Sequence, residues 1–225
     1  MIIETPRLPI QNPGEQHMPC VVLIDTSGSM AGHERELEEA LREMKETIME
    51  DDIARGRVEV SIITFDDDVK EIVPFGPISA MQIPHLDCGG MTHTHQAIDL
   101  ALRRVEERKN EYKSMNIVYN QPWIWLFTDG HANDSDNGAY DRLLQAQNNK
   151  KCVFYGVGIG NDVDEKELGR LHKKGMILKV SKESFKAAFE LLSVSVTAAS
   201  SHKPGETAQQ PIPADVNIKF IDLDM

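Results

Sequence analysis

Long apolar runs are missing from this sequence of 225 residues. No window approaches the roughly 18 consecutive apolar residues that mark a membrane-spanning helix. The first 18 residues also lack the basic start and the apolar stretch of a secretory signal peptide. We therefore expect a protein of the cytosol.

Cysteine is scarce, with Cys20, Cys88 and Cys152 as the only three residues of this type. Their number is odd and no two of them form a C-x-x-C pair, which argues against a disulfide framework or a zinc-binding pair. We expect reduced, half-buried thiols in a reducing compartment.

Basic residues are outnumbered, because 24 Lys and Arg stand against 36 Asp and Glu, for a net charge of −12. No basic stretch is long enough to offset this excess, so binding to a nucleic-acid backbone is not expected. The acidity itself indicates little more than solubility.

Apolar strands and amphipathic helices alternate along the chain, which predicts an α/β fold. The sheet should be doubly wound and mostly parallel, with about six strands, one antiparallel edge strand and helices on both faces. The expected strands are 20–25, 57–65, 69–73, 122–129, 152–160 and 176–180, and the expected helices are 33–51, 93–109, 139–149, 164–174 and 182–197.

Composition divides the chain into three parts. Residues 1–18 form an irregular lead-in with several prolines, and residues 19–197 form the α/β domain. Residues 198–225 are rich in Ser, Pro, Gln and Thr and predict a flexible tail. The apolar and acidic end of the tail, 216–225, could instead add to the sheet as a strand or dock on a partner.

Five small oxygen-bearing residues follow apolar runs or glycine pairs in three separate segments. They are Asp25, Ser27 and Ser29 in VVLIDTSGSM, Thr92 in GGMTHT, and Asp129 in WIWLFTDG. Two carboxylates and three hydroxyls suit a hard divalent cation such as Mg²⁺, with water completing the coordination. Strand 20–25 should end at the crevice where open α/β sheets bind ligands, which would place Asp25 there.

The charge of this set indicates a recognition site. Three of the five ligands are neutral hydroxyls, so a bound cation stays partly electron-poor and should attract a further carboxylate from a partner. Each segment also has a simpler interpretation taken alone, since DTSGSM could be a turn with a helix cap, Thr92 a helix cap, and Asp129 part of a strand-ending turn.

The spacing resembles the metal-ion-dependent adhesion site of von Willebrand factor A domains, in which Asp-x-Ser-x-Ser is followed by a Thr and then an Asp. The resemblance covers about residues 19–197 and implies the same doubly wound fold. It also implies a bound Mg²⁺, Mn²⁺ or Ca²⁺ and an acidic partner residue that completes its coordination. Met91 is a departure, because many bacterial relatives place Thr directly after the glycines, and Thr94 is therefore an alternative to Thr92.

Several other segments resemble the bacterial TerY type of stand-alone von Willebrand A protein: 7–10, 63–75, 156–168, 171–180 and 185–196. This resemblance implies a cytosolic role in tellurite-resistance or stress-response systems. It also implies a Ser/Thr kinase or a metal-dependent Ser/Thr phosphatase as partner.

Two other functions compete with a metal-dependent interaction module. Asp25 could be the nucleophile of a dehalogenase-like phosphatase, but such enzymes need a second Asp two residues later, where this chain has Ser27. The chain also lacks a G-x-S-x-G elbow and a phosphate-binding P-loop, so we do not expect an enzyme. The second alternative is a structural domain with a vestigial metal site.

Four histidines follow the site segments directly: His33, His93, His95 and His131. We expect them on the rim of the crevice, as solvated loop residues or as a source of positive charge on protonation. Asp66, Asp67 and Asp68 predict a solvated hairpin turn, with a second cation site as the alternative.

Overall fold

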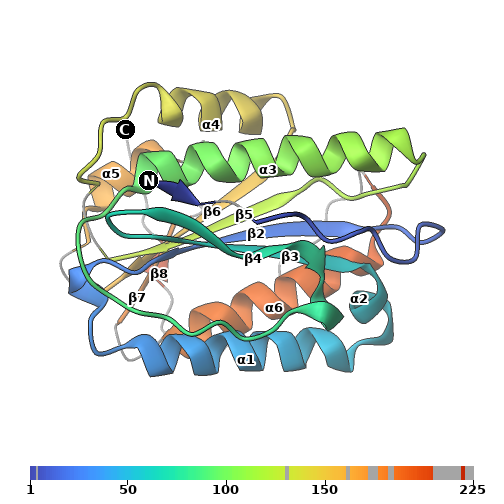
Figure 1. Cartoon of the computed structure of the whole chain (residues 1–225), viewed down its shortest axis with the longest axis horizontal. Helices are drawn as coiled ribbons and strands as arrows, with labels where there is room; N and C mark the ends of the chain where they lie inside the picture. The colour runs from blue at the N-terminus through green and yellow to red at the C-terminus, as the bar shows by residue number, and fades with distance from the viewer. Residues whose placement is uncertain are drawn as a thin grey trace.

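The computed structural model describes residues 1–3, 5–129, 132–160, 163–171, 177–181, 185–204 and 219–220. In this part of the chain, one eight-stranded sheet lies between two layers of helices (Figure 1). The strand order is β1-β4-β3-β2-β5-β6-β7-β8. The strands are β1 (Ile2–Ile3), β2 (Met18–Asp25), β3 (Val58–Phe65), β4 (Val69–Pro77), β5 (Trp123–Thr128), β6 (Val153–Ile159), β7 (Ile177–Val180) and β8 (Lys219–Phe220).

Helices cover both faces of the sheet, as the alternating pattern predicted. The layer drawn below the sheet in Figure 1 holds α1 (Glu34–Glu50), α2 (Asp52–Arg57) and α6 (Phe185–Ser201). The upper layer holds α3 (Thr94–Ser114), α4 (Ala139–Asn148) and α5 (Glu165–Arg170). Two short 3₁₀ helices, η1 (Gly28–Met30) and η2 (Ile78–Ala80), lie in the connections. No helix among the described residues combines the length and the apolar character needed to cross a membrane.

Alternating side chains of the central strands fill two separate cores, because successive residues of a strand face opposite sides of the sheet. On β2, Val22 and Ile24 pack in the core under α1 and α6, whereas Val21 and Leu23 pack under α3. The Trp residues of β5 are core residues, and Trp125 is only 1% exposed and stacks on Tyr155.

The predicted fold class is confirmed, although the sheet is wider than expected. β3 and β4 form the predicted antiparallel pair, but β1 pairs with β4 in parallel, so β4 is not the edge strand. Helix α2 was missed because its six residues run directly into β3; Asp51 caps it by accepting from the backbone N–H groups of Ile53 and Ala54.

The last described helix extends beyond the predicted domain boundary at residue 197. α6 runs to Ser201, and its final turn is bonded to the body of the domain: Arg57 donates to the Ser200 carbonyl and Asn120 to the Ala199 carbonyl. Within the predicted tail, β8 pairs antiparallel with β7, as Leu178 faces Phe220. Residues 205–218 and 221–225 lie outside the described residues.

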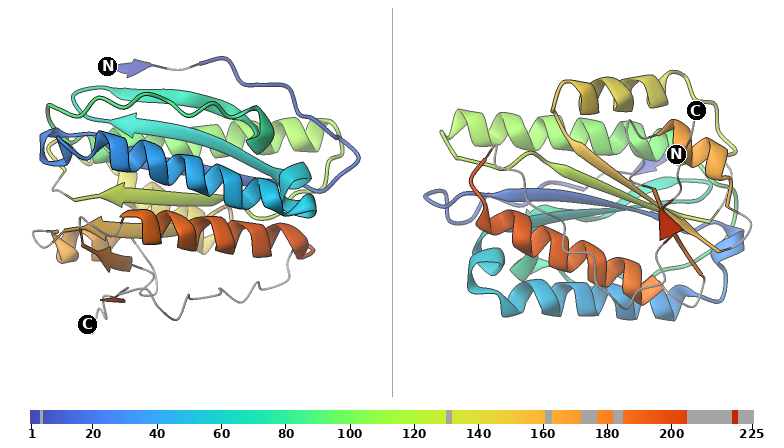
Figure 2. Two further views of the ribbon diagram at one scale, coloured as in Figure 1. Left: turned by 90° about the horizontal axis from the view of Figure 1, so that it is seen from below. Right: turned by 180° about the vertical axis from the view of Figure 1, so that it is seen from behind.

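Segments from the two ends of the chain occupy opposite edges of the sheet (Figure 2). β1 covers the outer side of β4, and β8 covers the outer side of β7. Each of these edge strands contributes two residue pairs.

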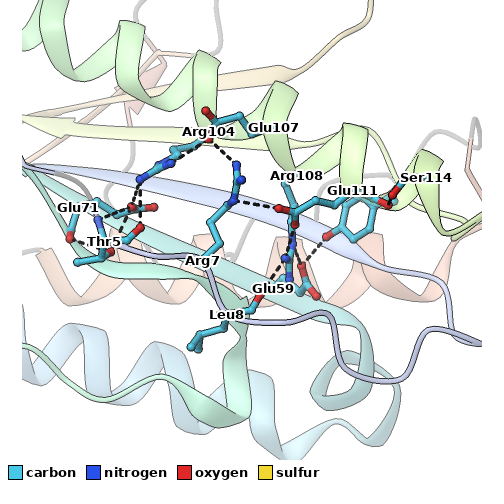
Figure 3. A network of polar contacts seen from close by, with 11 residues as sticks. Thr5, Arg7, Leu8, Glu59, Glu71, Arg104, Glu107, Arg108, Glu111 and Ser114 are labelled. Carbon is cyan, nitrogen blue, oxygen red and sulfur yellow. Dashed lines mark hydrogen bonds and ion pairs between the residues drawn. The ribbon is translucent and has the colours of Figure 1, made fainter.

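A buried network of charges ties α3 to β3 and β4 (Figure 3). Arg108 Nε donates to Glu59 Oε2 at 2.6 Å, and Arg104 Nη2 donates to Glu71 Oε2 at 2.5 Å. The lead-in completes both pairs, since Arg104 also donates to the Thr5 carbonyl and Arg108 to the Leu8 carbonyl.

Glu59 illustrates how the network tolerates charge in the core. Burial alone would raise its pKa, but the neighbouring His17 and the hydrogen bonds from Arg108 and Tyr112 outweigh burial and hold the pKa below its usual range. The carboxylate is therefore retained as an ion, and it depends on those partners.

We predict that Arg108→Met lowers the free energy of unfolding by about 3–5 kcal/mol, because it leaves Glu59 charged and buried without its cationic partner. Arg35→Met is the matched control. Arg35 pairs with Glu39 at the surface and is 89% exposed, so its loss should cost less than about 1 kcal/mol. Urea unfolding of both variants measures the difference, and equal losses would contradict the structural role of the buried pair.

Candidate metal centre

The site begins where two parallel strands end side by side. β2 and β5 are neighbours in the middle of the sheet, with Ile24 opposite Phe127. The next residues, Asp25 and Thr128, are therefore adjacent, and Thr128 Oγ1 donates to Asp25 Oδ2 at 2.6 Å. Asp25 is fully buried at this point.

The loop after β2 turns back over Asp25. The backbone N–H of Ser27 donates to Asp25 Oδ1 at 2.9 Å, and η1 then turns the chain within three residues. As a result Ser27 Oγ and Ser29 Oγ lie 3.1 Å apart.

Ser29 joins this loop to the one that follows β5. Its hydroxyl donates to Asp129 Oδ1 at 2.6 Å, although the two residues are 100 positions apart in the sequence. Mg²⁺ binds oxygen at 2.0–2.1 Å in an octahedron, so neighbouring ligand atoms are about 3 Å apart. The oxygens of Ser27, Ser29 and Asp129 have spacings close to this value and thus fit a small hard cation.

Thr92 is brought to the same region by the two glycines that precede it in its loop. Gly28 N–H donates to the Gly90 carbonyl at 3.2 Å, and Gly89 N–H donates to the Thr26 carbonyl at 2.8 Å. These bonds lay the 89–92 loop against the loop after β2, and Thr92 itself is 6% exposed. The alternative ligand, Thr94, is the first residue of α3. The structure thus brings together the side chains of Asp25, Ser27, Ser29 and Asp129 by direct contacts, and Thr92 by loop packing.

Asn133 was not identified from the sequence, yet it holds the Thr92 loop in place. Thr92 N–H donates to Asn133 Oδ1 at 3.0 Å, and Asn133 N–H donates to the Thr92 carbonyl at 2.8 Å. This reciprocal pair ties the Thr92 loop to the loop that carries Asp129.

Asp134, also missed, caps the helix that follows. Its carboxylate accepts from the backbone N–H groups of His95 and Gln96 in the first turn of α3. A cap normally comes from the residue before its helix. Asp134 lies some forty positions later, so local sequence signals could not reveal it.

Burial dominates the electrostatics of the site. It raises the pKa of the Asp25 carboxyl to about 6, against hydrogen bonds from Ser27 and Thr128 that lower it, and nearby Asp129 adds to the rise. Two carboxylates therefore converge where solvation is poor, which is the arrangement that a bound cation relieves.

The expected rim of four histidines is only partly present. His33 precedes α1 and contacts Glu36, and His93 precedes α3. His95 is not a solvated rim residue, because it is 6% exposed, packs on Tyr140 and bonds Asp134 at 2.7 Å. His131 lies outside the described residues.

The other predicted sites are structural where the structure describes them. Asp164 caps α5 by accepting from the Glu167 N–H. Cys20, Cys88 and Cys152 are free thiols, but only Cys88 is half-buried as expected, whereas Cys20 and Cys152 are fully buried. No group of three or more His, Cys, Asp and Glu suited to a metal occurs among the described residues. The candidate centre is of another kind, since three of its five members are hydroxyl residues.

Solved structures of other proteins share this fold. The chain is similar to proximal thread matrix protein 1 from the mussel byssus, in a structure described as having a zinc-occupied MIDAS motif. Identity is 17%, the TM-score is 0.56, and the match covers 81% of this chain and 48% of that one. The ArnB paralog VWA2 from Sulfolobus acidocaldarius matches at 20% identity with a TM-score of 0.53, over 80% of this chain and 45% of that one.

The pilus adhesin SpaC from Lactobacillus rhamnosus GG, in its open conformation, matches at 12% identity with a TM-score of 0.64, over 84% of this chain and 30% of that one. The match spans less than half the length of each of these three proteins. At these sequence identities, the similarity shows a shared fold and nothing more.

No curated protein sequence is similar enough to this chain to count as a match. The family assignment comes from residues 20–192, which match the von Willebrand factor type A domain. That span runs from β2 into α6 and includes all five candidate ligands. The chain therefore belongs to the von Willebrand factor type A domain family.

Proposed function

We propose that the chain is a protein-interaction module that works through a divalent cation held by Asp25, Ser27, Ser29, Thr92 and Asp129. The observation that carries this proposal is the spacing of the Ser27, Ser29 and Asp129 oxygens, 3.1 and 2.6 Å, over a buried carboxylate. Hard oxygen donors favour Mg²⁺ or Mn²⁺, with Ca²⁺ as an alternative.

The two carboxylates have different roles in this proposal. Asp25 is fully buried and both of its oxygens accept hydrogen bonds, so it contributes mainly negative charge and reaches the cation through water. Ser27 and Asp129 are also buried, at 2% and 7% exposed, whereas Ser29 is exposed. The cation would therefore offer its open side to solvent beside Ser29.

An acidic residue of a partner protein is the ligand that best fits this open side. Only Asp129 would bring a carboxylate into direct contact with the cation, since Asp25 acts through water and the three hydroxyls carry no charge. The cation would therefore stay electron-poor and attract a further carboxylate. A cytosolic partner such as a Ser/Thr kinase or a metal-dependent phosphatase, in a tellurite-resistance or stress-response system, agrees with the TerY-like segments.

A phosphatase-like enzyme is a weaker proposal. The nucleophile would be Asp25, which is 0% exposed and whose oxygens are occupied by Ser27 and Thr128. Attack on a substrate needs an accessible oxygen in line with the reacting atom. The buried carboxylate therefore supports a role in binding.

We predict that the wild-type protein binds Mg²⁺ or Mn²⁺ at one site and that Asp25→Ala or Asp129→Ala weakens binding at least tenfold. Isothermal titration calorimetry measures the affinity. Asp99→Ala is the matched control, because this change also removes one carboxylate but at a surface position, where Asp99 pairs with Arg142. Unchanged affinity in Asp25→Ala would place the cation at another site.

The raised pKa of Asp25 predicts how the metal-free protein responds to pH. The unfolded value is near 3.9 and the folded value is about 6, so the stability associated with the protonated group is complete below about pH 4. That stability is lost as the pH rises through 6. Asp25→Asn avoids the loss, because Asn carries no charge and can still bond Ser27 and Thr128.

In EDTA, Asp25→Asn should therefore gain stability relative to wild type between pH 4.5 and 7.5, by on the order of 3 kcal/mol at most. Urea unfolding at the two pH values measures the gain. Asp141→Asn, a change at an exposed residue of α4, should show no such trend. A pH-independent difference for Asp25→Asn would show that the Asp25 charge is not the cause.

The partner prediction concerns reversibility. Complexes captured from native lysate should dissociate in EDTA, re-form when Mg²⁺ is restored, and be absent with Ser27→Ala. Changing the partner's acidic residue from Glu to Gln should weaken the complex. A complex that survives EDTA would assign partner binding to a different surface.

A further inference from the structure

The turn between β3 and β4 packs against two of the three ligand-bearing loops of the centre, the loop after β2 and the loop that carries Thr92. This turn consists of Asp66, Asp67 and Asp68 and is closed on itself, since Asp68 N–H donates to Asp66 Oδ1 at 2.8 Å. Thr26 Oγ1, in the loop after β2, donates to Asp66 Oδ2 at 3.2 Å. The expected solvated turn is therefore also a contact surface.

Asp67 makes the second contact, with the loop that leads to Thr92. Its Oδ1 accepts from the backbone N–H of Met91 at 3.0 Å. A Cβ on Gly90 would lie 2.4 Å from Asp67 Oδ2, so the carboxylate occupies the space of a missing side chain. Gly90 also has φ +78°, a conformation that favours glycine. Carboxylate and loop are thus in close contact over two successive residues.

We infer that Asp67 is a positioning residue, which fixes the Thr92 loop over the cation without being a ligand itself. The loop is also held by the reciprocal bonds between Thr92 and Asn133. Asp67 and Asn133, from two different loops, thus accept hydrogen bonds from the adjacent backbone N–H groups of Met91 and Thr92.

Geometry separates this role from that of an extra metal ligand. Asp67 Oδ1 bonds the Met91 N–H and Oδ2 lies against Gly90, so the carboxylate is directed at the peptide backbone. What the loop needs is a hydrogen-bond acceptor, which an amide supplies as well as a carboxylate does. A carboxylate that binds the cation directly would instead lose its charge in the change to an amide and hold the cation more weakly.

The first test measures Mg²⁺ affinity by calorimetry for Asp67→Ala and Asp67→Asn. This test rests on the proposed function, because it requires that the wild-type protein binds the cation. Asp67→Ala should weaken binding about five- to tenfold, whereas Asp67→Asn should remain within about twofold of wild type. Asp68→Ala is the matched control, because it removes one charge from the same turn. The Asp68 side chain contacts the N-terminal amine and Lys70 and not the Thr92 loop. Equal losses in Asp67→Asn and Asp67→Ala would overturn the inference in favour of a charge or ligand role.

A double substitution tests whether Asp67 acts through Thr92. In a Thr92→Val background the hydroxyl ligand is already missing, so adding Asp67→Ala should have little further effect on affinity. Additive losses would show that Asp67 acts by another route.

Amide exchange of the metal-free protein gives a readout that does not depend on the cation. Exchange at Met91 should be at least tenfold faster in Asp67→Ala than in wild type, with Asp67→Asn and Asp68→Ala close to wild type. Unchanged exchange at the Met91 amide in Asp67→Ala would overturn the positioning role of Asp67. If the wild-type protein binds no Mg²⁺ but Asp67→Ala still exchanges faster at Met91, the proposed function is refuted and the positioning role of Asp67 is retained.

Discussion

The parallel pairing of β2 with β5 is the constraint on which the centre depends. The two strands lie about a hundred residues apart in the sequence. Their pairing places their ends side by side, with Asp25 against Thr128. The contact between Thr128 and Asp25 follows directly from this register. A shift by one residue would turn Asp25 towards the opposite face of the sheet, and all its partners would be lost. The hydrophobic side chains of the two cores fix the register and so fix the chemistry.

Rigid support reaches the Thr92 loop from α3, the helix that begins directly after it. Near the middle of that helix, Arg104 and Arg108 form buried ion pairs with the sheet, and at its start Asp134 caps the first turn. The helix is thus anchored along its length before any ligand binds. Anchoring of this kind lowers the ordering cost of binding, since the loops need not be immobilised by the cation itself.

Much of this architecture could be predicted from the sequence because it depends on period and on position relative to strands. The strand and helix order followed from apolar spacing, and Asp25 and Asp129 were found because each ends an apolar run. Asn133 and Asp134 were not found, and Asp67 was predicted only as part of a solvated turn, because their roles depend on which loops meet in space. The burial of His95 escaped prediction for the same reason: its partners, Asp134 and Tyr140, come from later segments.

The short strands at the two margins of the sheet have a consequence for the behaviour of the protein in concentrated solution. Exposed strand margins present unpaired peptide groups that recruit further strands and lead to aggregation. Here Ile2–Ile3 blocks one margin and Lys219–Phe220 the other. Because each block is only two residues long, proteolytic trimming of either terminus would uncover β4 or β7 as a template for self-association.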